Sequence, residues 1–77
     1  MTPSALPVVK SRELIRALER LGFVLLRQSP GSHRQYQHPD GRRTTVPVHR
    51  GVDIGPGLLR KILRDVQIDA DELRRWL

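Results

Sequence analysis

Residues 31–47 read GSHRQYQHPDGRRTTVP, a polar segment that the rest of this 77-residue chain is expected to support. Two short stretches with strand-like alternation flank Pro39-Asp40-Gly41, where glycine supplies the positive φ of a hairpin turn. Tyr36 and Val46 are the only clear core-type side chains of the segment. The segment therefore predicts a β-hairpin with one face on the core and one polar face open to solvent.

The two-residue period of a strand divides the hairpin side chains between its two faces. Because Tyr36 marks the core side, Thr44, Val46 and Val48 of the next strand are predicted to share it. On the open face the same pattern places His33, Gln35, Gln37, Arg43, Thr45 and Pro47. Arg34 has the parity of Tyr36, and its long stem at a strand end can reach back to solvent.

Helical periodicity flanks the hairpin on both sides. A first helix is predicted from Ser11, as its N-cap, to Gly22, and the β-rich residues 23–28 form a first strand. A second helix begins at Pro56 after Gly55, and a short last helix begins at Asp69. The order is α-β-β-β-α with a short C-terminal helix. It predicts an α+β fold in which three antiparallel strands carry the helices on one face.

Length and composition indicate one domain, residues 10–77, preceded by a loose arm of residues 1–9. No segment approaches the roughly 18 apolar residues that span a bilayer, so no membrane partner is predicted. The chain has no cysteine, which excludes disulfides and thiolate metal sites and fits a cytoplasmic protein. The C-terminal residues Leu73, Trp76 and Leu77 are expected either to fold back on the core or to dock on a partner.

The net charge of +6 comes entirely from residues 1–50, and residues 51–77 are balanced. Arginine accounts for 12 of the 14 basic residues, and its planar guanidinium matches the geometry of phosphate. Nucleic acid is therefore the first partner to consider. A role of the same arginines in solubility alone stays open on this evidence.

The sequence contains no familiar catalytic motif, because its glycines match neither Walker nor Rossmann spacing. A metal site is not expected either, because the three histidines are not accompanied by an acidic residue that would act as a further ligand. RNA, however, carries its own nucleophile, the 2′-hydroxyl, and its cleavage needs a base and cationic donors. His33, after the small residues Gly31 and Ser32, is suitably placed for this role. A strand histidine is also often a plain surface residue. His38 is expected to shape the turn, and His49 to be structural or to contact phosphate.

Five motifs in order resemble the HicA toxin family over residues Lys10 to Ile68. They are Glu13-Leu14-Ile15 with Leu18, Leu21, Gly22 and Phe23; Gly31-Ser32-His33 with Tyr36; His38-Pro39-Asp40-Gly41-Arg42; Thr44-Thr45-Val46-Pro47 with His49; and Ile54, Gly57, Leu59-Arg60 and Ile62-Leu63. The resemblance implies a fold like that of double-stranded-RNA-binding domains. It also implies an mRNA interferase of a type II toxin–antitoxin pair, neutralised by a HicB-type antitoxin.

In that family the histidine of the Gly-Ser-His motif is catalytic, which corresponds to His33. The leading hypothesis is a metal-independent, cofactor-free endoribonuclease that cleaves mRNA with His33 as general base or acid. Its expected RNA-binding residues are Arg27, Ser32, Arg34, Arg42 and Arg43. Two alternatives stay open: a non-catalytic RNA-binding module, and an adaptor that binds a partner through the C-terminal helix.

Overall fold

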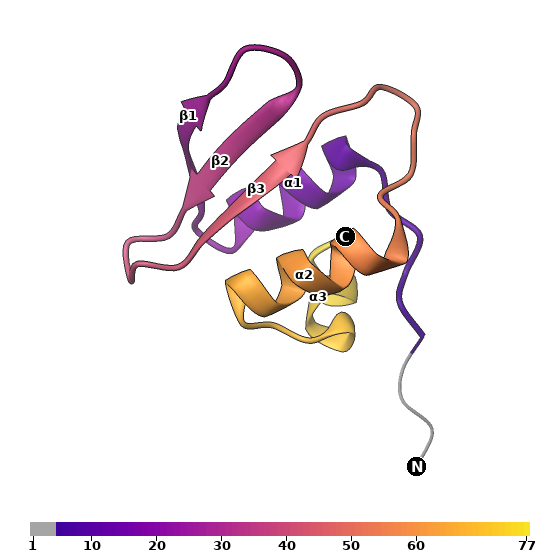
Figure 1. Ribbon diagram of the computed structural model, residues 1–77. Helices are drawn as coiled ribbons and strands as arrows, with labels where there is room; N and C mark the ends of the chain where they lie inside the picture. The colour runs from indigo at the N-terminus through magenta and orange to yellow at the C-terminus, as the bar shows by residue number, and fades with distance from the viewer. Residues whose placement is uncertain (1–4) are drawn as a thin grey trace.

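The computed structural model describes residues 5–77 and has the predicted order of elements. These are α1 (Ser11–Arg20), β1 (Val24–Gln28), β2 (His33–Gln37), β3 (Arg43–Pro47), α2 (Pro56–Val66) and α3 (Ala70–Trp76). The strands form one antiparallel sheet in the order β1-β2-β3. In Figure 1, α1 crosses behind the sheet, and α2 and α3 lie together beside it. The predicted α+β fold is confirmed.

The register of β2 and β3 confirms the predicted assignment of side chains to faces. Tyr36 lies opposite Thr44, and both are buried, as is Val46 opposite Arg34. The alternate pairs are His33 with Pro47, Gln35 with Thr45 and Gln37 with Arg43, and none of these six residues is buried. The described helices therefore leave one sheet face open.

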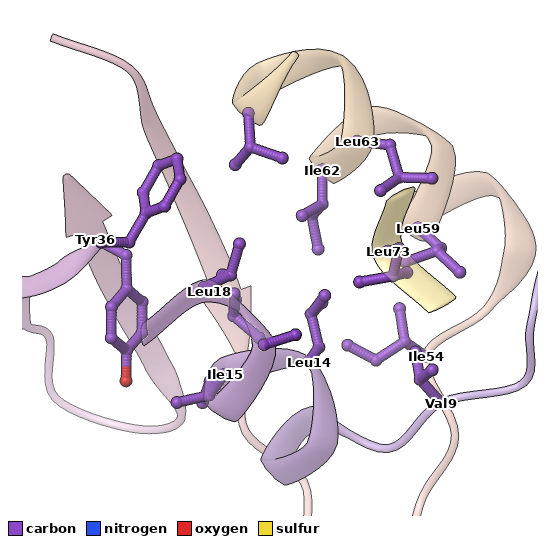
Figure 2. Close-up of a cluster of buried hydrophobic side chains, with 14 residues drawn as sticks. Val9, Leu14, Ile15, Leu18, Tyr36, Ile54, Leu59, Ile62, Leu63 and Leu73 are labelled. Carbon is purple, nitrogen blue, oxygen red and sulfur yellow. The ribbon is translucent and has the colours of Figure 1, made fainter. Parts of the chain in front are cut away.

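The hydrophobic core lies between the sheet and the three helices. Figure 2 shows Leu14 and Leu18 from α1 meeting Leu59 and Ile62 from α2, with Tyr36 at one side of the cluster. The four aliphatic side chains are at most 1% exposed. Their helical spacing in the sequence gives each helix one apolar stripe, and the stripes face each other. This core fixes the position of the hairpin relative to both long helices.

The predicted N-cap of α1 is wrong by one residue. Lys10 is the N-cap, and Ser11 is the first helical residue, only 4% exposed. Its hydroxyl donates to the carbonyl of Pro47 at 2.7 Å, a partner on a distant strand that the local sequence does not reveal. Glu13 accepts a hydrogen bond from the Lys10 N–H at 2.9 Å, which satisfies one amide at the start of the helix.

The other predicted helix ends are confirmed. Gly22 follows α1 with φ of +104°, the left-handed conformation expected of a residue just past a helix. Gly55 is the N-cap of α2 and Pro56 its first residue. The Asp69 carboxylate accepts from the Glu72 N–H at 2.7 Å and caps α3.

Both ends of the described chain pack on the core. Leu73 of α3 is fully buried, and Arg20 donates to the Trp76 carbonyl at 2.7 Å, so the C-terminal helix folds back on the domain. The predicted arm, residues 1–9, falls partly on residues 1–4, which lie outside the described residues. Val9 is 1% exposed, and its carbonyl accepts from the Ile54 N–H at 2.8 Å. The division at residue 10 stays a prediction.

β1 forms one edge of the sheet and differs most from a typical core strand. Val24, Leu25 and Leu26 are between 49% and 61% exposed. The pairing with β2 shifts between Leu25 and Arg27, which marks a β-bulge at Leu26. No helix within residues 5–77 is long and apolar enough to cross a membrane.

Candidate active site and nucleic-acid interface

His33 is the first residue of β2, and its side chain is exposed on the open face. The backbone on both sides of it is held. The Ser29 N–H donates to the His33 carbonyl at 3.0 Å, and the Val48 N–H donates to the Ser32 carbonyl. Gly31 has φ of +91°, so the preceding turn uses a conformation that favours glycine. A fixed backbone thus presents an imidazole that solvent and a ligand can reach.

Two predicted RNA-binding arginines share the open face with His33. Arg27 pairs with Gln35, so Arg27 lies diagonally across from His33. In an ordinary antiparallel sheet the Cα atoms of such diagonal neighbours are about 7–8 Å apart. Arg43 pairs with Gln37, four residues along β2 and therefore about 13 Å from His33. Both side chains are exposed, and neither forms an ion pair or a hydrogen bond among residues 5–77.

Arg42 has its hydrogen-bonding groups directed into the fold. Its Nε lies 2.8 Å from an Asp40 carboxylate oxygen, and its Nη1 donates to the carbonyl of Val66 at the end of α2. The guanidinium also lies 5.2 Å from the centre of the Phe23 ring. Arg42 thus connects the β2–β3 turn to Phe23, just after α1, and to the end of α2. Its sequence neighbour Arg43 makes no such contact within residues 5–77.

His38 and Asp40 organise the turn between β2 and β3. The His38 ring packs edge-on against Phe23 with centroids 5.2 Å apart, and its Nδ1 lies 3.1 Å from the Asp40 amide nitrogen. The Arg42 N–H, donating to Asp40, holds the pKa of that carboxyl below its usual 3.8. The Arg42 guanidinium and the charge of His38 act in the same direction, against desolvation. These contacts agree with the expectation that His38 shapes the turn.

Arg34 lies on the opposite face of the sheet from His33, together with three arginines that the sequence analysis did not single out. A groove runs along α1, between this helix, the start of β2 and residues 48–51. We call it the α1 groove; its charged and imidazole-bearing lining residues are Lys10, Arg12, Arg16, Glu19, Arg34, His49 and Arg50. The sequence does contain a signal for it, since Arg12 and Arg16 are like charges at i and i+4, which disfavours an isolated helix.

The remaining predicted site residue, Ser32, is half-buried in the β1–β2 turn next to His33. Within residues 5–77, no three His, Asp or Glu side chains lie close enough together to hold a metal ion. The open face therefore brings together His33, Arg27 and Arg43, with Ser32 at its end, and leaves Arg34 and Arg42 elsewhere.

The fold and the open face define a small basic α+β domain. Among residues 5–77, one histidine and two arginines on that face have no side-chain partner. The sequence profile of the family described as HicA toxin of bacterial toxin-antitoxin matches residues 11–68, and the chain belongs to this family. It is therefore a toxin of a toxin–antitoxin system, which implies an antitoxin partner. A comparison with curated proteins gave no match.

Proposed function

We propose that this toxin is a metal-independent endoribonuclease that cleaves mRNA at the open face, with His33 as its catalytic residue. The observation that carries the proposal is the position of His33 on a polar, uncovered sheet face diagonal to Arg27, both without a side-chain partner among residues 5–77. A structural histidine would be expected to pack or to hydrogen-bond, as His38 does in the turn after β2.

The proposed chemistry uses the nucleophile that RNA supplies. The His33 imidazole accepts the proton of the 2′-hydroxyl, and the resulting oxygen attacks the adjacent phosphorus. The bond from phosphorus to the 5′-oxygen breaks, and that oxygen takes up a proton from imidazolium or water. The products are a 2′,3′-cyclic phosphate and a 5′-hydroxyl end. Arg27 stabilises the additional negative charge on the phosphoryl oxygens, and Arg43 holds the backbone farther along the face.

Ser32, Arg34 and Arg42 were also expected to bind RNA, and their surroundings support different contributions. Ser32 is adjacent to His33 and can reach the same phosphate region. Arg34 can meet RNA only on the other face of the sheet, and Arg42 acts through the position of the turn. A HicB-type antitoxin is the proposed partner, and the cytoplasm, where mRNA is located, is the proposed place of action.

The test is to incubate the purified protein with end-labelled single-stranded RNA in EDTA. The comparison includes His33→Ala and, as a control on the same face of the same strand, Gln35→Ala. We expect His33→Ala to lower the cleavage rate by about 10²–10⁴-fold, the usual contribution of a general acid or base. Gln35→Ala should retain most of the activity, and the products should carry 5′-hydroxyl ends.

Three outcomes would contradict parts of the proposal. If wild type and His33→Ala bind RNA equally and neither cleaves it, the protein is a non-catalytic RNA-binding module. If cleavage requires a divalent metal, the mechanism is wrong although the activity class stands. If the protein shows no salt-dependent affinity for RNA, the third hypothesis, an adaptor acting through the C-terminal helix, is favoured. Leu73 of that helix is buried in the core, so such an adaptor would contact its partner through Trp76 and Leu77.

A further inference from the structure

The α1 groove has a volume of about 840 Å³ and a lining rich in charged side chains. One wall is the exposed stripe of α1 that carries Arg12 and Arg16. The other is formed by Arg34 at the start of β2 and by His49 and Arg50 in the segment after β3. In Figure 1 this segment arches past the N-terminal end of α1.

The groove concentrates cations that the fold leaves uncompensated. Arg12, Arg16, Arg34 and Arg50 form no ion pair and no side-chain hydrogen bond among residues 5–77. Glu19 is the single carboxylate in the lining. Several basic residues elsewhere are engaged: Arg42 with Asp40, Lys61 with Asp65 and Arg74 with Asp71. Four free guanidiniums around one concavity repel each other unless an anion binds between them.

The groove lies directly behind the end of the sheet that carries His33. Pro47 pairs with His33, and its carbonyl accepts from Ser11, the residue before Arg12. Val48, which lines the groove, donates to the carbonyl of Ser32, the residue before His33. Pro47 and Val48 thus connect the end of the open face to the groove. A polymer that passes over this end of the sheet can contact both.

The composition of the lining indicates which part of a nucleic acid fits. Arginine binds phosphate through two parallel hydrogen bonds, and four of the lining residues are arginines. No Phe, Tyr or Trp lines the groove, so it lacks the aromatic platforms on which single-stranded bases stack. This chemistry suits the backbone of RNA and gives little discrimination among bases.

We propose that the α1 groove binds the phosphate backbone of single-stranded RNA that extends beyond the linkage cleaved at His33. The inference rests on the proposed function for the position of the scissile linkage, but groove binding itself is independent of cleavage. It makes the RNA footprint longer than the open face alone. RNA of a few nucleotides fills the open face only, whereas a longer strand also neutralises the groove arginines.

The test measures RNA binding in a His33→Ala background, which prevents cleavage during the measurement. The groove variant is Arg12→Gln/Arg16→Gln. The matched control is Arg60→Gln/Arg64→Gln, which removes two exposed arginines with the same i, i+4 spacing from α2. Fluorescence anisotropy compares labelled single-stranded RNAs of 5 and 20 nucleotides over a series of salt concentrations, and circular dichroism verifies folding. Arg50→Gln, from the opposite wall, provides a second reading with one substitution.

We expect the groove variant to lose about tenfold or more in affinity for the 20-mer. The slope of log affinity against log salt should fall by about 1.4, the value for two phosphate contacts to a single strand. Its affinity for the 5-mer should stay close to that of the background protein. The control variant should change the 20-mer affinity and its salt slope much less. Arg50→Gln should also weaken binding of the 20-mer.

Equal losses in the groove and control variants would overturn the proposal, because net charge alone would then explain the affinity. Poly-glutamate serves as an acidic-peptide probe: if the groove variant loses affinity for it but keeps that for RNA, the groove suits a protein partner and the proposal is wrong. If the wild-type protein cleaves RNA but the groove variant binds the 20-mer as tightly as the background protein, only the groove inference is contradicted. If the groove variant loses affinity for the 20-mer but the wild-type protein does not cleave RNA, only the proposed activity is contradicted.

Discussion

At the level of single residues, Arg42 and Arg43 show how adjacent identical side chains take different roles. Arg43 is the first residue of β3, whereas Arg42 is the last residue of the turn before it. Arg42 is directed to Asp40, to Val66 and to the Phe23 ring. Arg43 is exposed on the open face opposite Gln37. Sequence composition counts both as basic residues available to a polyanion, although the fold already uses one of them.

We predict that Arg42→Ala and Arg43→Ala separate stability from binding. Arg42→Ala removes a hydrogen bond to the Val66 carbonyl and a cation–π contact, which should lower the free energy of unfolding by about 1–2 kcal/mol. Arg43→Ala should change it by less than about 0.5 kcal/mol and instead weaken RNA binding. Urea denaturation and anisotropy measure the two effects, and the reverse pattern would contradict the assignment.

Asp40 gives a prediction about pH. Because hydrogen bonds from Arg42 lower the pKa of Asp40 in the folded protein, the carboxylate stabilises the fold fully above the ordinary pKa of 3.8. This contribution is lost as pH falls below 3.8 through the folded-state pKa. Wild type should therefore have a higher urea midpoint than Asp40→Asn at pH 7, and the difference should shrink in that acidic range. A difference that stays constant down to pH 2 would exclude this role.

At the level of elements, the exit from α1 determines how the helix joins the sheet. Gly22 adopts φ of +104°, and a Cβ at this position would lie 3.0 Å from Nε2 of His38. The Phe23 N–H donates to the Leu18 carbonyl at 2.9 Å, which closes the end of the helix. Phe23 then enters the core under His38 and Arg42. The helix end and the hairpin turn are thus packed against each other.

Two glycine substitutions should have opposite effects on stability. Gly22→Ala forces a left-handed backbone and crowds His38, so it should lower the free energy of unfolding by about 1 kcal/mol or more. Gly57→Ala lies inside α2 with open space around the new Cβ, and it should raise this free energy by about 0.5–1 kcal/mol. Thermal and urea unfolding measure both. A neutral Gly22→Ala would show that this turn is easily remodelled.

At the level of the whole molecule, α3 completes the core. Leu73 is fully buried among residues of the other elements, whereas Leu77 is 42% exposed at the chain end. A chain of this size buries a smaller share of its surface than larger domains do, so each buried leucine counts for more. The short C-terminal helix is therefore part of the domain that carries the open face.

Leu73→Ala should lower the free energy of unfolding by about 2–5 kcal/mol, as expected when a fully buried leucine is replaced by alanine. The control is Leu77→Ala, which replaces an exposed leucine at the C-terminus and should change the free energy of unfolding by less than about 1 kcal/mol. Urea denaturation of both variants tests the difference. Equal and small effects would mean that α3 contributes little to the core and that RNA binding can be studied without it.

The sequence by itself determined the order of elements, the two faces of the hairpin and most helix ends. These depend on local rules: the two-residue period around Tyr36, the helical period around Leu14 and Leu59, and the conformational freedom of Gly22. Resemblance in ordered motifs also led to the family. The residue that sequence rules misplaced, Ser11, differs because its hydroxyl bonds to Pro47, 36 residues away.

Only the tertiary structure decided which arginines are available to a ligand. Arg42 is held by Asp40 and Val66, Arg34 lies on the far side of the sheet from His33, and Arg12 joins it in the α1 groove. The exposure of the apolar strand β1 at the sheet edge was likewise not evident from its composition. The physical reason is the same throughout: local pattern fixes the direction of a side chain on its own element, whereas its charge partners and its neighbours come from segments distant in sequence.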